Sequence, residues 1–129
     1  MPKEGATSAM SASWVLKAAS ISGALAIGLG AFGAHGLKGK VPVEMIKVWE
    51  TAAHYHLVHS AALLGLAAAN KQGLTSKRAA KLAPPLMAAG VLLFSGSLYA
   101  MVLTGNKKLG IVTPIGGVLL IGGWVAMAI

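Results

Sequence analysis

Three of the four histidines in this 129-residue chain lie within six residues of one another, as His54, His56 and His59. Imidazole nitrogens bind zinc, copper or haem iron, and they also carry protons and hydrogen-bond neighbouring helices. On a helix, His56 and His59 share a face because residues three apart are neighbours, whereas His54 lies about 160° from His56. The cluster is therefore the first place to look for chemistry.

His35, the fourth histidine, is separated from the cluster by a turn and a short lead-in. We expect it at the same end of the molecule, within reach of the other three. Zinc requires three or four ligands, so His35, His54, His56 and His59 are the candidate ligands of a metal or haem. An ionisable group inside a membrane can instead mark a proton or substrate path.

A structural role for the imidazoles is the interpretation that we favour. A neutral histidine between membrane helices commonly forms a hydrogen bond worth roughly 1 kcal/mol. We therefore expect no bound metal and no cofactor, and the sequence defines no cofactor-binding residue. The residues expected to form polar contacts between helices are His59, Ser95, Ser97 and Tyr99.

No catalytic set is evident, and we expect that the protein is not an enzyme. Ser60, Ser95 and Ser97 have no matched carboxylate, which a serine nucleophile needs behind its base. The only acidic residues are Glu4, Glu44 and Glu50. All three are predicted outside the lipid core, whereas a proton-coupled carrier usually has a buried titrating group. Residues 28–33 fit a dinucleotide-binding pattern, but no strand precedes them, so we reject that motif.

The composition is that of a membrane protein. Hydrophobic residues make up 56% of the chain, charged residues only 11%, and the mean hydropathy is +0.73. Soluble domains carry about 25% charged residues. The net charge of +8 comes from lysines and arginine in short polar segments, which suits anionic lipid headgroups and not nucleic acid.

The hydrophobic pattern predicts an all-α fold, an integral membrane bundle of four transmembrane helices with both termini on the same side. A polar N-terminal tail over residues 1–13 precedes the four-helix domain at 14–129, and residues 43–50 form an interfacial lead-in. The expected helices cover residues 14–36, 51–70, 77–104 and 109–129. Each is long enough to cross about 30 Å of hydrocarbon.

Small residues recur at helical spacing on three of these segments. They allow the close backbone approach on which helix packing in lipid depends. We expect them to close the bundle on itself; alternatively, some face outward and dock another membrane subunit. The predicted packing residues are Ser22, Ala26, Gly30, Gly33, Gly96, Ala100, Gly116 and Gly123.

Four motifs in order resemble a small family of four-helix membrane proteins of unknown function, which includes bacterial YgdD-like inner-membrane proteins and the eukaryotic transmembrane protein 256 family. They are LGAFGAHGLK at residues 29–38, AHYHLVHSAALL at 53–64, LFSGSLYA at 93–100 and LGIVTPIGG at 109–117. The resemblance implies the four-helix fold and brings no established catalytic residues. The His54–His56 pair resembles the eukaryotic members, which are mitochondrial, so a mitochondrial inner membrane is favoured and a bacterial inner membrane is the alternative.

The resulting expectation is a structural or accessory subunit of an inner-membrane assembly such as a respiratory complex. Its partners would be membrane lipids, other membrane subunits or further copies of itself. A small oligomeric carrier or channel is the first alternative, and a histidine-ligated metal or haem protein is the second.

Overall fold

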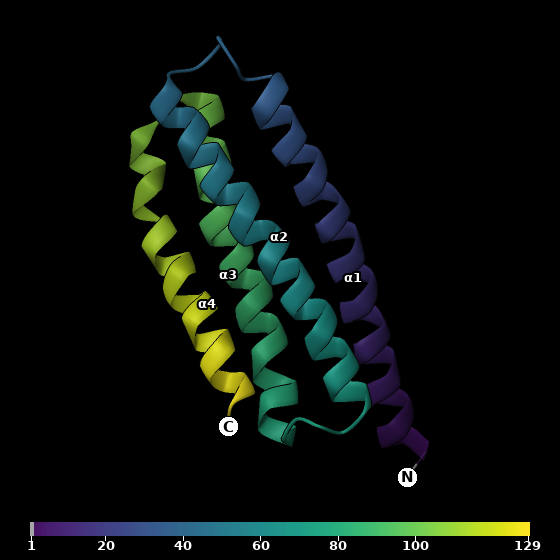
Figure 1. Cartoon of the computed structure of the whole chain (residues 1–129). Helices are drawn as coiled ribbons and strands as arrows, with labels where there is room; N and C mark the ends of the chain where they lie inside the picture. The colour runs from purple at the N-terminus through teal and green to yellow at the C-terminus, as the bar shows by residue number, and fades with distance from the viewer. Residues whose placement is uncertain (1) are drawn as a thin grey trace.

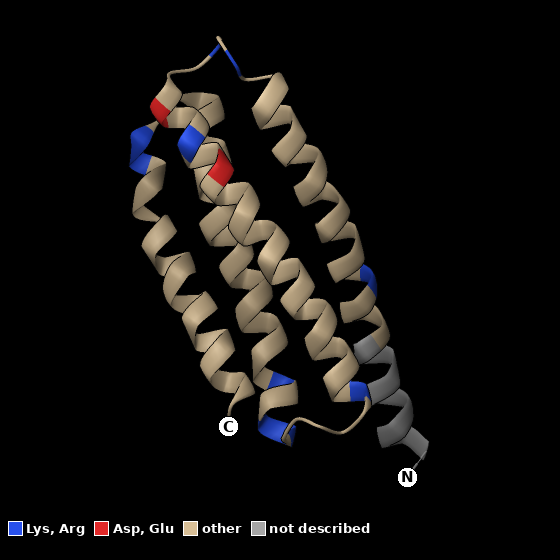
Figure 2. Ribbon diagram, viewed as in Figure 1, with Lys and Arg blue, Asp and Glu red and all other residues tan. Residues whose placement is uncertain are grey.

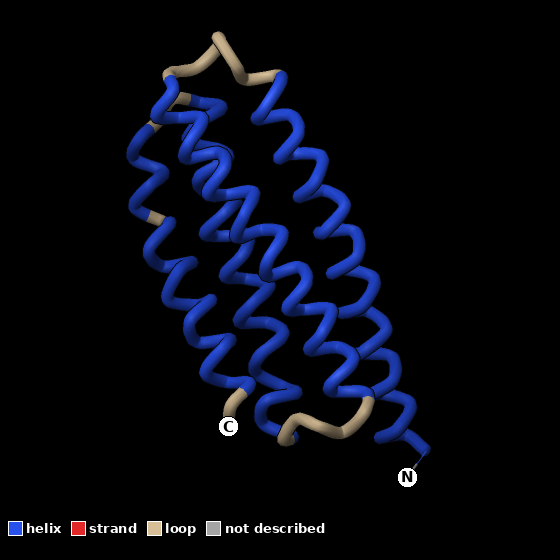
Figure 3. Tube along the Cα trace, viewed as in Figure 1, coloured by secondary structure: helices blue, strands red, loops and turns tan. Residues whose placement is uncertain are grey.

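The computed structural model describes residues 2–129, with side chains from residue 13 onward, and this part of the chain is helical (Figure 3). The elements are α1 (Pro2–His35), α2 (Val43–Lys71), α3 (Lys77–Thr104), the 3-10 helix η1 (Lys107–Ile111) and α4 (Thr113–Met127). Consecutive α-helices pack against each other, α1 on α2, α2 on α3 and α3 on α4. Short connections make such neighbours antiparallel.

The two central helices separate the two outer ones. Figure 1 shows α1 and α4 on opposite sides of the α2–α3 pair, and the beginning of α1 and the C-terminus at the same end of the bundle.

Capping residues mark both ends of α3. The Ser76 hydroxyl accepts a hydrogen bond from the Ala79 amide at the start of α3, and Gly105 ends that helix with a φ of 72°.

Three helix bounds differ from the sequence expectation. In the described backbone, α1 begins at Pro2, so residues 2–13 extend the first helix, while Met1 and the side chains of residues 2–12 lie outside the described part. Residues 43–50 are the first two turns of α2 and not a separate lead-in, because Pro42 places a helix start directly after it. The last helix begins at Thr113, because Asn106 caps a 3-10 turn before it.

Two apolar clusters lie toward opposite ends of the bundle. One is built from all four helices and consists of Ala19, Leu63, Leu66, Ala83, Met87 and Ala126. The other is formed by Leu37, Trp49 and Val102, with Leu29 and Tyr99 packed against it. Along α2, Trp49 and Leu66 are separated by 17 steps of about 1.5 Å, or about 26 Å, which is close to the thickness of a bilayer's hydrocarbon core.

Three helical segments of the described chain are long and apolar enough to cross a membrane: Ser13–His35, Lys77–Thr104 and Lys107–Met127. Their outward side chains are apolar, with Ile21, Leu92 and Ile121 between 65% and 74% exposed. The lysines and arginine gather toward the ends of the bundle, apart from Lys17 on α1 and Lys47 near the start of α2 (Figure 2). α2 is not among the three segments, because its hydropathy is lowered by three histidines and by charged residues in its first two turns.

Glycines mark the closest approaches of α4 to α3. A Cβ at Gly116 would overlap the backbone of Phe94, and a Cβ at Gly123 would lie 2.6 Å from Cγ of Met87. Gly90, which the sequence analysis did not single out, takes the same part on α3, since a Cβ there would lie 2.7 Å from Leu120. These pairs fix the register of the two helices.

The small residues of α1 face α2. Ala26 is 2% exposed, a Cβ at Gly30 would touch Ala53, and a Cβ at Gly33 would overlap the Trp49 indole. Gly96 corrects the expectation for α3, because a Cβ there would meet nothing within 4 Å. Ala100 is half-buried. The sequence pattern correctly predicted that Gly96 lies in a helix. It could not show that no neighbouring helix comes close to that face.

Candidate functional site

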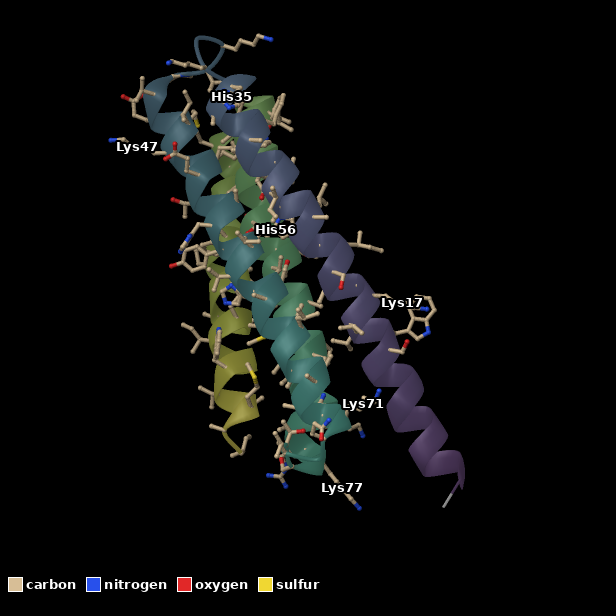
Figure 4. All side chains as sticks on the ribbon, turned by 45° about the vertical axis from the view of Figure 1, so that its right-hand side comes forward. Lys17, His35, Lys47, His56, Lys71 and Lys77 are labelled. Atoms are coloured by element: carbon tan, nitrogen blue, oxygen red, sulfur yellow. The ribbon has the colours of Figure 1, made fainter. Side chains whose placement is uncertain are left out.

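His56 occupies the middle of the bundle, where α1, α2 and α3 meet (Figure 4). It is 5% exposed and lies near the midpoint between the two apolar clusters. Its Nδ1 is 3.0 Å from the hydroxyl of Tyr99 on α3, and its Nε2 is 2.9 Å from the hydroxyl of Ser22 on α1. One imidazole therefore joins three helices.

If the His56 ring is neutral, only one assignment of donors and acceptors satisfies every hydrogen bond around it. The Ser60 hydroxyl donates to the carbonyl oxygen of His56 at 2.7 Å, so its single proton is used. Ser22 must then donate to Ser60, 2.6 Å away, and accept from Nε2–H of His56. Nδ1 is left as an acceptor for the Tyr99 hydroxyl. The chain begins at Tyr99 and ends on the backbone of His56.

His59 makes a second contact between helices. Its Nδ1 lies 2.8 Å from the carbonyl oxygen of Tyr55, which only accepts, so Nδ1 carries the proton. Its Nε2 accepts from the indole N–H of Trp124 on α4 at 3.0 Å, because an indole only donates. Both nitrogens are thus satisfied by a neutral ring, and protonation of Nε2 would break the bond to Trp124.

The remaining predicted polar residues join neighbouring helices. Ser95 of α3 donates to the carbonyl oxygen of Ala52 on α2 at 2.8 Å. The Ser97 hydroxyl is 2.6 Å from the hydroxyl of Thr113 beyond η1 and also donates to Phe94. His59, which was predicted to form a polar contact between helices, is bonded to Trp124 of α4. Spacing along α2 alone does not reveal which helix supplies its partner.

The four candidate metal ligands do not come together. His56 and His59 are buried, but their nitrogens are occupied by the partners just described. His54 is exposed on the outside of α2, and His35 is exposed at the end of α1, far from His56 in Figure 4. Within the described residues, no three histidine or carboxylate side chains are placed to hold a metal ion.

Trp49 is the main site residue that sequence reasoning missed. It is 1% exposed, its indole N–H donates to the Leu29 carbonyl oxygen at 2.6 Å, and its ring lies 4.6 Å from that of Tyr99 and 5.6 Å from that of Phe32. Trp49 thereby positions the phenol that donates to His56. Its spacing of seven residues from His56 puts the two on one helical face, a signal that was present in the sequence.

Ser60 and Trp124 were also absent from the predicted contacts, although both complete the network. Every buried side-chain nitrogen and oxygen in the described part of the chain has a hydrogen-bond partner. The hydroxyls of Ser60 and Ser95 donate to backbone carbonyls, so neither is paired with a base. Chemically, this arrangement locks helices to each other in fixed registers.

Comparison with known proteins agrees with this description of a membrane bundle. The family model described as "Protein of unknown function (DUF423)" matches residues 29–117. A UPF0382 membrane protein of Staphylococcus aureus (strain bovine RF122 / ET3-1) is 49% identical over 105 residues, which cover 81% of this chain and 84% of the relative. The UPF0382 membrane protein YwdK of Bacillus subtilis (strain 168) is 44% identical over 111 residues, covering 84% and 88%. No solved structure matches the chain.

These findings confirm the resemblance to an uncharacterised family of membrane proteins. Its finer assignment, to YgdD-like proteins and the transmembrane protein 256 family, stays a prediction. The matching relatives named above are bacterial and give the expected mitochondrial membrane no support. With more than two thirds of its length matched by the family model, the chain belongs to the DUF423 family of proteins of unknown function.

Proposed function

We propose that this protein spans the bilayer four times, with α2 as the fourth span, and acts as a non-enzymatic structural or accessory component of a membrane assembly. The observation that carries the proposal is the use of the polar groups of α2. His56, His59 and Ser60 are all consumed in bonds within the bundle. A polar core of this kind gives the helices their register and offers no reactive group.

The case for α2 as a span rests on its position. It packs against α1 on one side and α3 on the other, and both of those helices contain candidate spans. Buried polar groups that are paired cost far less in lipid than exposed ones. Part of the low hydropathy of α2 therefore comes from His56, His59 and Ser60, which are buried and paired inside the bundle.

A non-enzymatic role is supported by the acidic residues as well as by the hydroxyls. Glu44 and Glu50 are exposed in the first two turns of α2, and both precede the level of His56 by more than one helical turn. A nucleophile or proton relay in the core would need a carboxylate or a second free imidazole. The described core provides neither, since His59 is bonded through both nitrogens.

We place the protein in a bacterial cytoplasmic membrane, on the strength of its relatives. Its basic ends suit anionic headgroups. The common end of α1 and the C-terminus implies that both termini lie on the same side of that membrane.

Single-cysteine labelling tests the four spans directly, because the chain contains no cysteine. Lys40→Cys, Gln72→Cys and Asn106→Cys each place a thiol in an exposed turn. Four spans require a membrane-impermeant maleimide to reach positions 40 and 106 from one side and position 72 from the other. Labelling of 40 and 72 from the same side would show that α2 does not cross.

The accessory role has its own test. After extraction in a mild detergent, the protein should migrate on a native gel in a species larger than one chain. Migration at the size of one chain only, in several mild detergents, would contradict the assembly role while leaving the four spans in place.

A further inference from the structure

The outward face of α2 carries polar side chains at a depth where lipid offers them no partner. His54 is exposed, and no hydrogen bond joins its imidazole to another described side chain. It lies three to four residues from the midpoint between Trp49 and Leu66, or about 5 Å along the helix. An unpaired imidazole there would face hydrocarbon, which is costly.

His54 belongs to a continuous stripe of exposed residues. At 100° per residue, all its members lie within about 40° of His54 around the helix. Between Lys47 and Ala68 the stripe, here called the α2 outer face, consists of Lys47, Glu50, His54, Val58, Ala61, Gly65 and Ala68, all of them exposed. A Cβ at Gly65 would meet nothing within 4 Å, so the lower half of the face is smooth and open.

We propose that the α2 outer face binds the same face of a second copy of this protein, forming a parallel twofold dimer in the membrane. This names a partner for the proposed assembly role and so rests on that role. Ala61 and Gly65, four residues apart, allow two backbones to come close. His54 then meets His54 of the second copy near the bilayer centre.

Two features make the face complementary to itself. A neutral imidazole has one donor and one acceptor nitrogen, so two of them can form a hydrogen bond with each other. Lys47 and Glu50 lie on opposite sides of the stripe's midline, at about +20° and −40°. Across a twofold axis, each Lys47 therefore faces Glu50 of the other copy, as charged flanking positions do in parallel coiled coils.

Cysteine cross-linking in native membranes tests this dimer. A disulfide forms only when the two Cβ atoms come within about 4.5 Å, so Ala61→Cys should give a covalent dimer on mild oxidation. The controls Ile27→Cys, Leu92→Cys and Val118→Cys lie within the apolar segments of α1, α3 and α4, and the native residues there are 64%, 74% and 66% exposed. They should stay monomeric.

Variants of His54 distinguish a specific dimer from cross-links that form when two copies collide at random in the membrane. In the Ala61→Cys background, His54→Leu should lower the association constant about fivefold, the value of one interhelical hydrogen bond. His54→Asn keeps a donor and an acceptor and should restore cross-linking.

The charged pair is tested separately. Exchanging the charges in Lys47→Glu/Glu50→Lys should leave the dimer intact, whereas Lys47→Glu alone should weaken it.

Several outcomes would overturn the dimer. They are the absence of a cross-link at position 61, an equal cross-link at any control position, and a cross-link of position 61 to a different protein only. Each leaves the labelling pattern at positions 40, 72 and 106 unaffected, so the dimer can fail while the four-span function stands. Failure of that pattern would remove both.

Discussion

Two imidazoles three residues apart are held in opposite protonation patterns. The closed hydrogen-bond chain through Ser22 and Ser60 requires the proton of His56 on Nε2, whereas the Tyr55 carbonyl requires the proton of His59 on Nδ1. The difference has a consequence for each ring. His56 can accept a second proton if only the Tyr99 hydroxyl turns away, while His59 must give up Trp124.

Nuclear magnetic resonance of the imidazole nitrogens tests this assignment. With nitrogen-15-labelled histidine in lipid bilayers, we expect one buried ring to carry its proton on Nε2 and the other on Nδ1. His56→Gln and His59→Gln, each examined alone, assign the two signals. Identical tautomers at the two positions would contradict the directed chain.

At the scale of the helix, glycines decide how close α3 and α4 can come. Gly116 lies against the backbone of Phe94, which cannot rotate away as a side chain would. Gly123 lies against the flexible side chain of Met87, so its replacement is more easily accommodated. The position of a glycine on its helix therefore matters less than what faces it.

Gly116→Ala and Gly96→Ala form a matched pair that measures this effect. The first should separate α3 from α4 and destabilise the fold by about 2 kcal/mol or more, the usual scale of an overpacked core. The second gains up to about 1 kcal/mol of helix propensity in open space and should be neutral or slightly stabilising. Unfolding by denaturant in detergent micelles measures both.

A similar loss of stability in the two variants would mean that helix packing is not the cause. Gly96 would then have a role that its open surroundings do not explain.

Several helix ends and packing faces can be recognised in the sequence. The Ser76 cap and Gly105 mark the ends of α3, and the strip through Ala26 and Gly30 marks the face of α1 that packs on α2. What the sequence could not supply was the identity of each partner. The Trp124 indole that binds His59 lies 65 residues further along, and Gly90 and Gly96 differ only in what stands opposite.

The same limit explains the histidine cluster. Spacing along α2 places His56 and His59 on one face, but the directions of their rings depend on Ser22, Tyr99 and Trp124 from three other helices. A zinc site needed at least three of the four imidazoles to converge. Two of them, His35 and His54, instead point outward.

The packing of the whole molecule explains how a helix as polar as α2 can lie inside an apolar bundle. A helix with three imidazoles and charged first turns is a poor span by itself, yet it packs against both neighbours in the centre of an apolar bundle. The other three helices present apolar side chains outward and are long and apolar enough to cross a membrane. α2 depends on them, because Ser22, Tyr99 and Trp124 supply partners for its two buried imidazoles.

Membrane insertion of single segments tests this dependence. Placed alone in a host protein, residues 77–104 and 107–127 should insert efficiently, since both are long and apolar enough to cross a membrane. Residues 49–71 should insert poorly alone but cross in the full chain, because polar groups in mid-span cost free energy unless they are paired.

Replacing His56 and His59 by leucine should have opposite effects on the isolated segment and on the full bundle. The isolated segment should insert better, while the full bundle loses its bonds to Ser22 and Trp124 and unfolds more easily. Efficient insertion of the unaltered segment alone would show that α2 needs no partner helix, and the polar core would then have to serve something other than assembly of the bundle.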